Sequence, residues 1–178
     1  PGDGYTIVLG NTGTVAINPS VYPKMTYDPV KDFVAIGLTT TNALMATIAG
    51  NVPASNLQEF IAHAKKNPGK LNFGSPGNGS IGQLAGEMFK QMAGIEMTHV
   101  PYKGAGAALT DLLSGQIQVM FESVGISLPP AQAGLVRPLG VSTAQRIAEL
   151  PDLPTIAESG YPDYRVSVWY GIAAPVKM

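Results

Sequence analysis

The sequence predicts an α/β fold in which a mainly parallel sheet is flanked by helices, and two observations lead to this fold class. Short apolar runs typical of strands alternate with segments whose apolar residues have helical spacing. The 21 glycines and 15 prolines of the 178-residue chain gather at the junctions, where they favour tight loops. Strands that alternate with helices through short loops form mainly parallel sheets with both faces covered.

The N-terminal part of the chain is expected to contain strands and one short helix. Strands are predicted at residues 5–9, 33–38 and 44–49, and a Thr-rich segment separates the last two. A short helix is predicted at residues 16–22, after a Gly-rich loop at residues 11–14.

Helix starts are marked by capping boxes, in which a Ser or Thr and a Glu or Gln three residues later satisfy each other's main-chain N–H groups. The matching pairs are Ser55 with Gln58, Ser80 with Gln83, and Thr155 with Glu158. The first predicts a helix to about residue 67. The second predicts a helix that Gly94 ends, with Leu84, Met88 and Met92 on its apolar stripe. The third predicts a very short helix.

The remaining elements follow from apolar runs and from Gly and Pro punctuation. Further strands are expected at residues 71–74, 95–100, 117–121, 136–141 and 165–173, and further helices at residues 107–113 and 129–133. Pro138 lies inside one of these strands, which argues for a sheet edge or a strand start.

Loops that follow the predicted strands are rich in main-chain N–H and hydroxyl groups and poor in catalytic side chains. They are residues 11–14, 75–80, 102–105 and 122–123. In parallel sheets ligands gather at the carboxyl ends of the strands, and the start of a helix attracts anions. The pattern therefore predicts a site for a phosphate, a sulfate or a carboxylate.

A nucleotide site is the main alternative, because residues 77–82 match G-x-G-x-x-G between a strand and a helix. Such a site needs an acidic residue at the end of the next strand, and that position holds Val100-Pro101-Tyr102-Lys103. The match therefore favours loop geometry with small-anion binding over a nucleotide-dependent enzyme.

Composition excludes several other classes of function. Charged residues make up 13% of the chain, the net charge is −1 and no basic run is present, which argues against nucleic acid. Apolar runs are too short and too interrupted to insert into a membrane. Without cysteine there is no thiol catalysis or Cys-ligated zinc, and two separated histidines make a metal site improbable. We therefore expect no catalytic residue, metal or cofactor.

Individual side chains near these loops have more than one interpretation. Lys103 could contact a ligand or be a solvated lysine, and Tyr102 could offer its hydroxyl to a ligand or pack at the rim. Glu122 could bind a ligand hydroxyl or amine, or anchor a neighbouring loop. His99 is more typical of a packed or hydrogen-bonded histidine than of a base.

Several motifs, in order along nearly the whole chain, resemble one known family. They are residues 3–6, 9–14, 17–19, 27–33 (YDPVKDF), 68–73 (PGKLNF), 99–104 (HVPYKG) and 150–155 (LPDLPT). Together they resemble the substrate-binding receptors of tripartite tricarboxylate transporters, the Bug or TctC family.

This resemblance implies a periplasmic, non-enzymatic receptor with a type II periplasmic-binding-protein fold. Such a receptor closes around a small carboxylate, such as a di- or tricarboxylate, an amino acid or an aromatic acid. It then delivers the ligand to membrane permease subunits. By analogy, residues 1–34 would be part of lobe 1, residues 35–165 a nearly complete lobe 2, and residues 166–178 a hinge strand returning to lobe 1. The chain is expected to be a fragment, and a sensing module without a transport role is a further alternative.

The resemblance also implies which residues bind the ligand. Asn11, Thr12 and Thr14 match the first-lobe loop, and Ser75, Gly77, Asn78, Gly79, Ser80, Tyr102, Lys103 and Gly104 match the second-lobe loops. Two positions depart from the family pattern near the expected pocket. Gln83 stands where His is frequent, and Glu122 stands where Asp or Asn is usual. The identity of the ligand therefore cannot be transferred from relatives.

Overall fold

The computed structural model describes residues 4–176, which form two compact units. Unit 1 comprises Pro1–Asn42 and Val168–Met178, and unit 2 comprises Ala43–Ser167. The resemblance placed these divisions at 34/35 and 165/166. Among the described residues, no helix has both the length and the apolar character needed to span a membrane.

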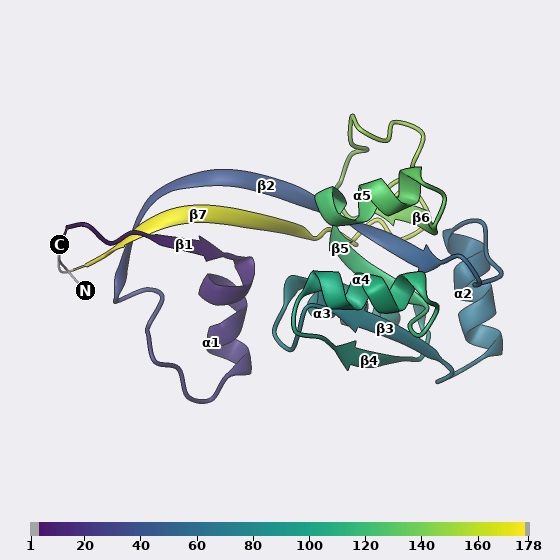
Figure 1. Ribbon diagram of the computed structural model, residues 1–178, viewed down its shortest axis with the longest axis horizontal. Helices are drawn as coiled ribbons and strands as arrows, with labels where there is room; N and C mark the ends of the chain where they lie inside the picture. The colour runs from purple at the N-terminus through teal and green to yellow at the C-terminus, as the bar shows by residue number, and fades with distance from the viewer. Residues whose placement is uncertain (1–3, 177–178) are drawn as a thin grey trace. The chain divides into compact units, whose positions relative to one another are not determined.

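Unit 1 is a small antiparallel arrangement of strands with one helical segment (Figure 1). Strand β1 (Val8–Asn11) pairs with β7 (Ser167–Pro175) in a register that sets Val8 opposite Ala173 and Asn11 opposite Tyr170. Strand β7 in turn lies beside β2. The predicted helix is present, but as two joined pieces, the π-helical η1 (Thr12–Ile17) and α1 (Asn18–Val21).

Residues 11–14 are not the open loop that their Gly-rich sequence predicted. Asn11 caps η1, because its Oδ1 accepts from the Thr14 N–H at 2.9 Å. The Asn11 N–H donates to the Thr14 hydroxyl at 3.0 Å. This reciprocal pair satisfies main-chain groups that an open loop would leave to solvent, so the helix begins at Thr12.

Strand β2 (Phe33–Ala49) is one 17-residue strand, whereas two strands were expected. The Thr-rich segment continues the strand, because β-branched side chains favour extended backbone. The Thr39 hydroxyl donates to the Tyr170 carbonyl at 2.9 Å, which helps to hold this segment beside β7.

Unit 2 contains a mixed sheet with the strand order β6–β2–β5–β3–β4. Strands β3 (Leu71–Ser75), β4 (Met97–Pro101) and β5 (Val119–Ser123) are parallel. The unit 2 part of β2 runs antiparallel to β5 and to β6 (Val136–Val141). The α/β class is confirmed, and the expected parallel pairing holds for the β5–β3–β4 part of the sheet.

The edge position predicted from Pro138 agrees with the sheet. Strand β6 pairs with β2, and their register shifts between Ala46 and Thr47, where Thr47 faces Pro138. A proline lacks the N–H that a regular ladder needs, so an irregular edge pairing accommodates it.

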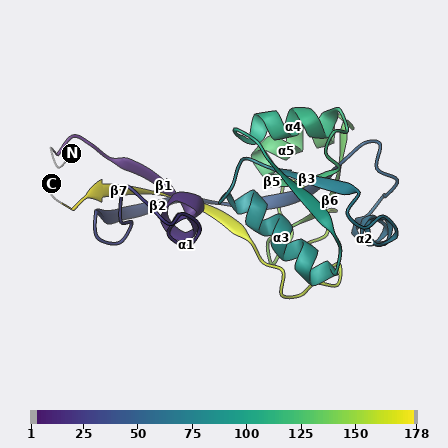
Figure 2. The ribbon, with the colours of Figure 1, turned by 90° about the horizontal axis from the view of Figure 1, so that it is seen from below.

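Helices cover both faces of this sheet. They are α2 (Leu57–Lys66), α3 (Ile81–Ala93), α4 (Ala105–Leu113) and α5 (Val124–Gln132). Figure 2 shows α3 on one face of the sheet and α4 and α5 on the other. Helix α5 begins earlier than expected. The pair Pro129 and Pro130 was interpreted as a helix start, but both prolines lie inside the helix.

The predicted apolar stripe of α3 is wrong. Leu84 is 40% exposed, and the buried face instead carries Gly82, Ala85, Gly86, Phe89 and Ala93. Small residues on this face allow a close approach to the sheet. A Cβ added at Gly82 would lie 2.6 Å from the Phe121 carbonyl oxygen, and one at Gly86 would lie 2.5 Å from the Phe73 ring.

Phe89 is at the centre of the α3 contact. Its ring lies 5.4 Å from Phe121 and 6.0 Å from Tyr164, measured between ring centroids. The buried Tyr164 hydroxyl donates to the Ala85 carbonyl at 3.0 Å, so its polar end is satisfied within the core.

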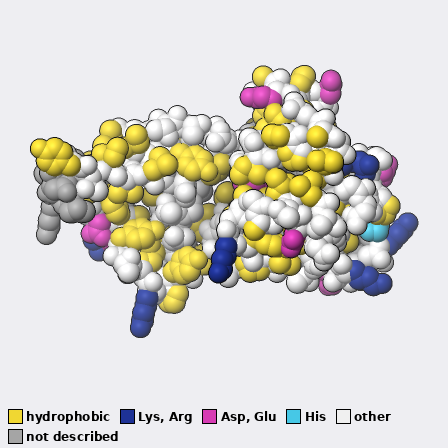
Figure 3. All heavy atoms as spheres, in the orientation of Figure 1, with side chains coloured by type: hydrophobic (Ala, Val, Ile, Leu, Met, Phe, Trp, Pro, Cys, Tyr) yellow, Lys and Arg dark blue, Asp and Glu magenta, His cyan; other side chains and the backbone are white. Residues whose placement is uncertain are grey.

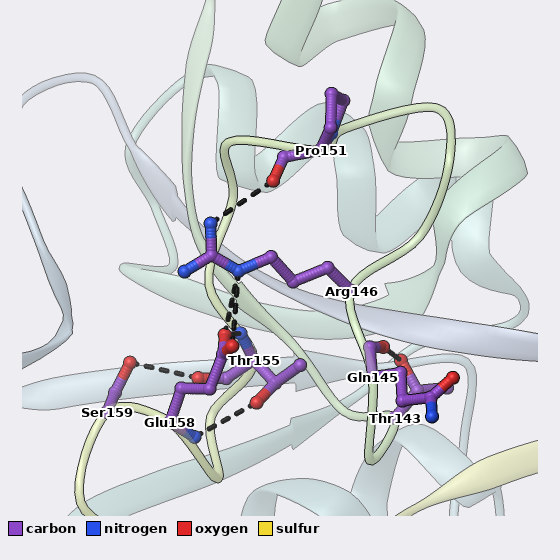
Figure 4. Close-up of polar contacts among 7 residues, drawn as sticks. All are labelled: Thr143, Gln145, Arg146, Pro151, Thr155, Glu158 and Ser159. Carbon is purple, nitrogen blue, oxygen red and sulfur yellow. Dashed lines mark hydrogen bonds and ion pairs between the residues drawn. The ribbon is translucent and has the colours of Figure 1, made fainter.

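The predicted capping boxes have different outcomes. Asn56, rather than Ser55, caps α2, because its side chain accepts from the Glu59 N–H at 2.9 Å. Thr155 and Glu158 form the expected reciprocal pair, at 2.8 and 2.9 Å (Figure 4). This pair closes a turn rather than a helix. Arg146 adds an ion pair with Glu158 at 2.9 Å.

Candidate functional site

The carboxyl ends of β3, β4 and β5 lie at one edge of the unit 2 sheet. Ser75 is opposite Pro101, and Gly74 is opposite Met120, two residues before Glu122. The structure therefore brings the loops 75–80 and 102–105 to the same edge, where ligands of such sheets bind. Residues 122–123 also lie there, but they are the end of β5 rather than the expected loop, because α5 follows directly.

Hydrogen bonds join two of these loops directly. The Tyr102 N–H donates to the Ser75 carbonyl at 3.0 Å, and the Gly104 N–H donates to the Pro76 carbonyl at 3.1 Å. A Cβ at Gly77 would lie 3.3 Å from the Tyr102 carbonyl oxygen, and its φ of +142° also favours glycine. The two loops are therefore one connected frame.

Several main-chain amides of this frame donate hydrogen bonds within the frame itself or to the start of α3. The Gly77 N–H donates to the Ser75 hydroxyl at 3.2 Å, the Gly79 N–H to Gln83 Oε1 at 2.7 Å, and the Ser80 N–H to the Gly77 carbonyl at 3.2 Å. We expected these amides to hold the ligand. Gln83 takes part in the cap as predicted, although it reaches Gly79 rather than Ser80.

Ser80 and Lys103 are the candidate side-chain donors on these two loops. The Ser80 hydroxyl accepts from the Gln83 N–H at 3.3 Å, so its own hydrogen is left to donate. Lys103 is exposed and forms no ion pair within the described part of the chain. A hydroxyl, a cation and the positive end of the 13-residue helix α3 together suit a carboxylate or another small anion. Asn78 is exposed on the same loop.

Tyr102 does not offer a free hydroxyl. Its O–H donates to Asp111 Oδ2 on α4 at 2.7 Å. Burial and the Asp111 carboxylate raise the pKa of Tyr102 to about 12, so the phenol is neutral at ordinary pH. The hydrogen bond to Asp111 holds the ring in position beside the loop. Asp111 was not singled out from the sequence, and its only signal was an acidic residue inside an apolar helix.

Glu122 is buried, with 7% of its surface exposed. Its Oε1 accepts from the Ser123 N–H at 2.8 Å, whereas its Oε2 has no partner within the described chain. Burial raises the pKa of Glu122 above its usual range. The contact with the adjacent Ser123 does not decide between a ligand contact and the anchoring of a neighbouring loop, and both stay predictions.

The unit 1 residues assigned to the site lie together at the start of η1. Asn11 and Thr14 are occupied by the reciprocal cap. The Thr12 hydroxyl accepts from the Trp169 N–H at 3.0 Å, which leaves its hydrogen as a donor. The Thr12 hydroxyl and the Asn11 side-chain N–H₂ group are therefore the side-chain donors of this segment for which no contact is described.

Unit 1 also has an apolar cavity of about 540 Å³ beside these residues. It is lined mainly by apolar side chains and glycines of β1, β2 and β7, including Leu9, Phe33, Leu38, Trp169 and Ile172. Figure 3 shows hydrophobic side chains gathered over these strands. A cavity with so few polar groups does not suit a carboxylate. Within the described residues no cluster of three or more metal-ligating side chains occurs.

The sheet with its helices and loop-lined edge defines a unit of the periplasmic-binding-protein class. Sequence comparison gives the family. The model of the TctC family, the tripartite tricarboxylate transporter family receptor, matches residues 1–178. The chain belongs to this family, which is a family of receptors and not of enzymes.

Similar proteins support the same assignment. A UPF0065 protein from the tcbD–tcbE intergenic region of Pseudomonas sp. (strain P51) is 36% identical over 98% of this chain and 52% of its own length. The periplasmic binding protein BugD has 32% identity and a TM-score of 0.93, and the match covers 100% of this chain and 60% of BugD. The chain thus spans about half the length of the curated relatives it matches.

Related structures were solved with carboxylates bound. R. palustris Rpa4515, with adipate, has 38% identity and a TM-score of 0.95, and the match covers 99% of this chain and 59% of Rpa4515. MatC from Rhodopseudomonas palustris, with malate, has 28% identity and a TM-score of 0.91, covering 100% of this chain and 61% of MatC.

Proposed function

We propose that this chain is the ligand-binding part of a periplasmic receptor that captures a small organic carboxylate. The receptor delivers the acid to the permease subunits of a tripartite tricarboxylate-type transporter. The observation that carries the proposal is the joined frame of loops 75–80 and 102–105, in which the loop that carries Lys103 is hydrogen-bonded to the loop that leads into Ser80 and α3. The acids bound to Rpa4515 and MatC support the same ligand class.

The frame would bind an acid by position and charge rather than by reaction. The Gly77, Gly79 and Ser80 amides are committed to the fold. The ligand would therefore receive hydrogen bonds from the Ser80 hydroxyl and from Lys103 Nζ. No side chain of the frame acts as a nucleophile or base in this proposal, and a nucleotide-dependent enzyme is not favoured by the family.

Calorimetric titration with adipate, malate and nicotinate tests the proposal, with glucose and spermidine as controls. We expect binding of at least one acid, weakening with added salt because Lys103 is exposed. Binding of glucose or spermidine without binding of any acid would refute it.

A matched pair of variants tests the frame itself. Lys103→Gln should weaken acid binding by about ten- to 150-fold, because a hydrogen bond from a charged donor contributes about 1.5–3 kcal/mol. Lys65→Gln, an exposed lysine on α2, should leave affinity unchanged. Equal losses in both variants would show a general charge effect instead of a contact.

A further inference from the structure

The Ser75 hydroxyl, at the carboxyl end of β3, makes contacts that identify the role of a nearby histidine. Its Oγ lies 3.2 Å from the Gly77 nitrogen, 3.1 Å from the Gly77 carbonyl oxygen and 2.7 Å from His99 Nε2 on β4. Ser75 is fully buried, so these contacts are its whole hydrogen-bonding environment within the described chain.

The chemistry of a hydroxyl decides which partner donates. A serine hydroxyl has one hydrogen to donate and two lone pairs that accept. The Gly77 N–H can only donate and the Gly77 carbonyl can only accept, so the arrangement that makes all three contacts hydrogen bonds directs the Ser75 hydrogen to that carbonyl. The remaining lone pair is satisfied only if His99 Nε2 carries a proton and donates.

We propose that His99 is a positioning residue, which donates from Nε2 to Ser75 and thereby fixes the loop that presents Ser80 to the ligand. The inference rests on the proposed function for its link to acid binding. Its structural basis is independent, because Ser75 connects β4 to both main-chain groups of Gly77. Gly77 in turn accepts from the Ser80 N–H, at the residue that caps α3.

Packing holds the imidazole in place, and no charged residue of the described chain is seen to form an ion pair with it. The ring lies 4.8 Å from the Phe73 ring, measured between centroids. Burial lowers the pKa of His99, Glu87 on α3 acts in the opposite direction and Lys90 on α3 acts in the same direction. Both the neutral Nε2–H form and the imidazolium donate from Nε2, so titration of His99 does not break the contact.

Nitrogen-15 NMR of the imidazoles tests the proton assignment directly in the 178-residue chain. At neutral pH we expect His99 to show a protonated Nε2 and an unprotonated Nδ1. The chain has two histidines, so a His63→Gln variant identifies which signals belong to His99. A neutral His99 protonated at Nδ1 would overturn the proposal.

Three variants separate positioning from packing. His99→Phe keeps an aromatic ring against Phe73 but has no donor, whereas His99→Gln restores an N–H group at a similar distance from the backbone. We expect His99→Phe to speed hydrogen exchange of the Gly77 amide, and to weaken adipate or malate binding, by about three- to tenfold. His99→Gln should recover most of both losses. In a Ser75→Ala background, His99→Phe should have little further effect.

Equal behaviour of His99→Phe and His99→Gln would show that the histidine only packs. The outcomes are also separable from the proposed function. If the unaltered chain binds none of the acids, the receptor proposal fails. The imidazole signals and the exchange rate of the Gly77 amide still decide the role of His99.

Discussion

The two segments that leave a strand and start a helix, residues 11–14 in unit 1 and residues 75–80 in unit 2, are built differently. In unit 1 the turn is closed mainly by its own side chains, through the reciprocal pair of Asn11 and Thr14. In unit 2 the turn is also held from β4 and its loop, by His99, Tyr102 and Gly104. Similar sequence features therefore produce one locally capped turn and one turn fixed by tertiary contacts.

The two units also differ in how completely they bury large apolar side chains. Unit 2 buries large side chains such as Phe60, Phe73, Phe89 and Phe121 almost completely. In unit 1, Tyr5 is 96% exposed and Ile36 is 61% exposed. The free energy that holds unit 2 together comes from burial, whereas unit 1 depends more on strand pairing and local caps. The predictions below test this contrast.

The largest difference is expected for truncation of a large apolar side chain in each unit. Phe89→Ala should lower the free energy of unfolding of unit 2 by about 3–5 kcal/mol, because it leaves a cavity beside Phe121 and Tyr164. Ile36→Ala in unit 1 should change stability by less than about 0.5 kcal/mol. Urea denaturation, with hydrogen exchange to report on each unit, measures both. Similar losses would remove the contrast.

A matched pair of glycines tests how closely α3 approaches the sheet. Gly82 and Gly106 are each the second residue of a helix, α3 and α4, but a Cβ at Gly106 meets no atom within 4 Å. Gly82→Ala should destabilise unit 2 by about 1–3 kcal/mol through overlap with the Phe121 carbonyl. Gly106→Ala should stabilise it by about 0.4–1 kcal/mol. Thermal unfolding of both variants decides, and a stabilising Gly82→Ala would contradict the packing.

Removing the helix-capping side chain should cost more stability at residues 11–14 than at residues 75–80, because the second turn is also held by tertiary contacts. Asn11→Ala removes the Oδ1 that accepts from the Thr14 N–H, whereas the bond from the Asn11 main-chain N–H to the Thr14 hydroxyl can remain, and the loss should cost about 1 kcal/mol. Ser80→Ala should cost less, because Gln83 still accepts from Gly79 and the β4 contacts remain. Amide hydrogen exchange at Thr14 and Gln83 compares the two turns. A larger effect at Ser80 would reverse the proposed order of local and tertiary support.

The smallest expected effect concerns pH. Because burial raises the pKa of Glu122 in the folded state, the folded state holds this proton more tightly than the unfolded state does. Stability should therefore fall as pH rises from the usual glutamate range toward the raised value. Glu122→Gln removes this titration. Relative to the parent chain it should gain stability at neutral pH and none in acid. Denaturant unfolding at several pH values measures the difference, and a constant difference would contradict it.

Local sequence signals determined much of what is seen along the chain. Alternating apolar runs gave the order of strands and helices, Gly94 ends α3 in a left-handed conformation, and Thr155 pairs with Glu158 as expected. These features depend on residues a few positions apart, whose geometry is set by the backbone itself. The motifs shared with the TctC family could likewise be recognised from the amino-acid sequence alone.

Tertiary structure alone decided the buried face of α3, the partner of the Tyr102 hydroxyl and the contact between His99 and Ser75. Each depends on the register between β3 and β4, or on how closely a helix approaches a sheet. A stripe of large residues predicted the wrong face of α3, because glycine and alanine permit the closer contact. The hydrogen bonds that join loops 75–80 and 102–105 are decided in the same way, because β3 and β4 meet only in the folded chain.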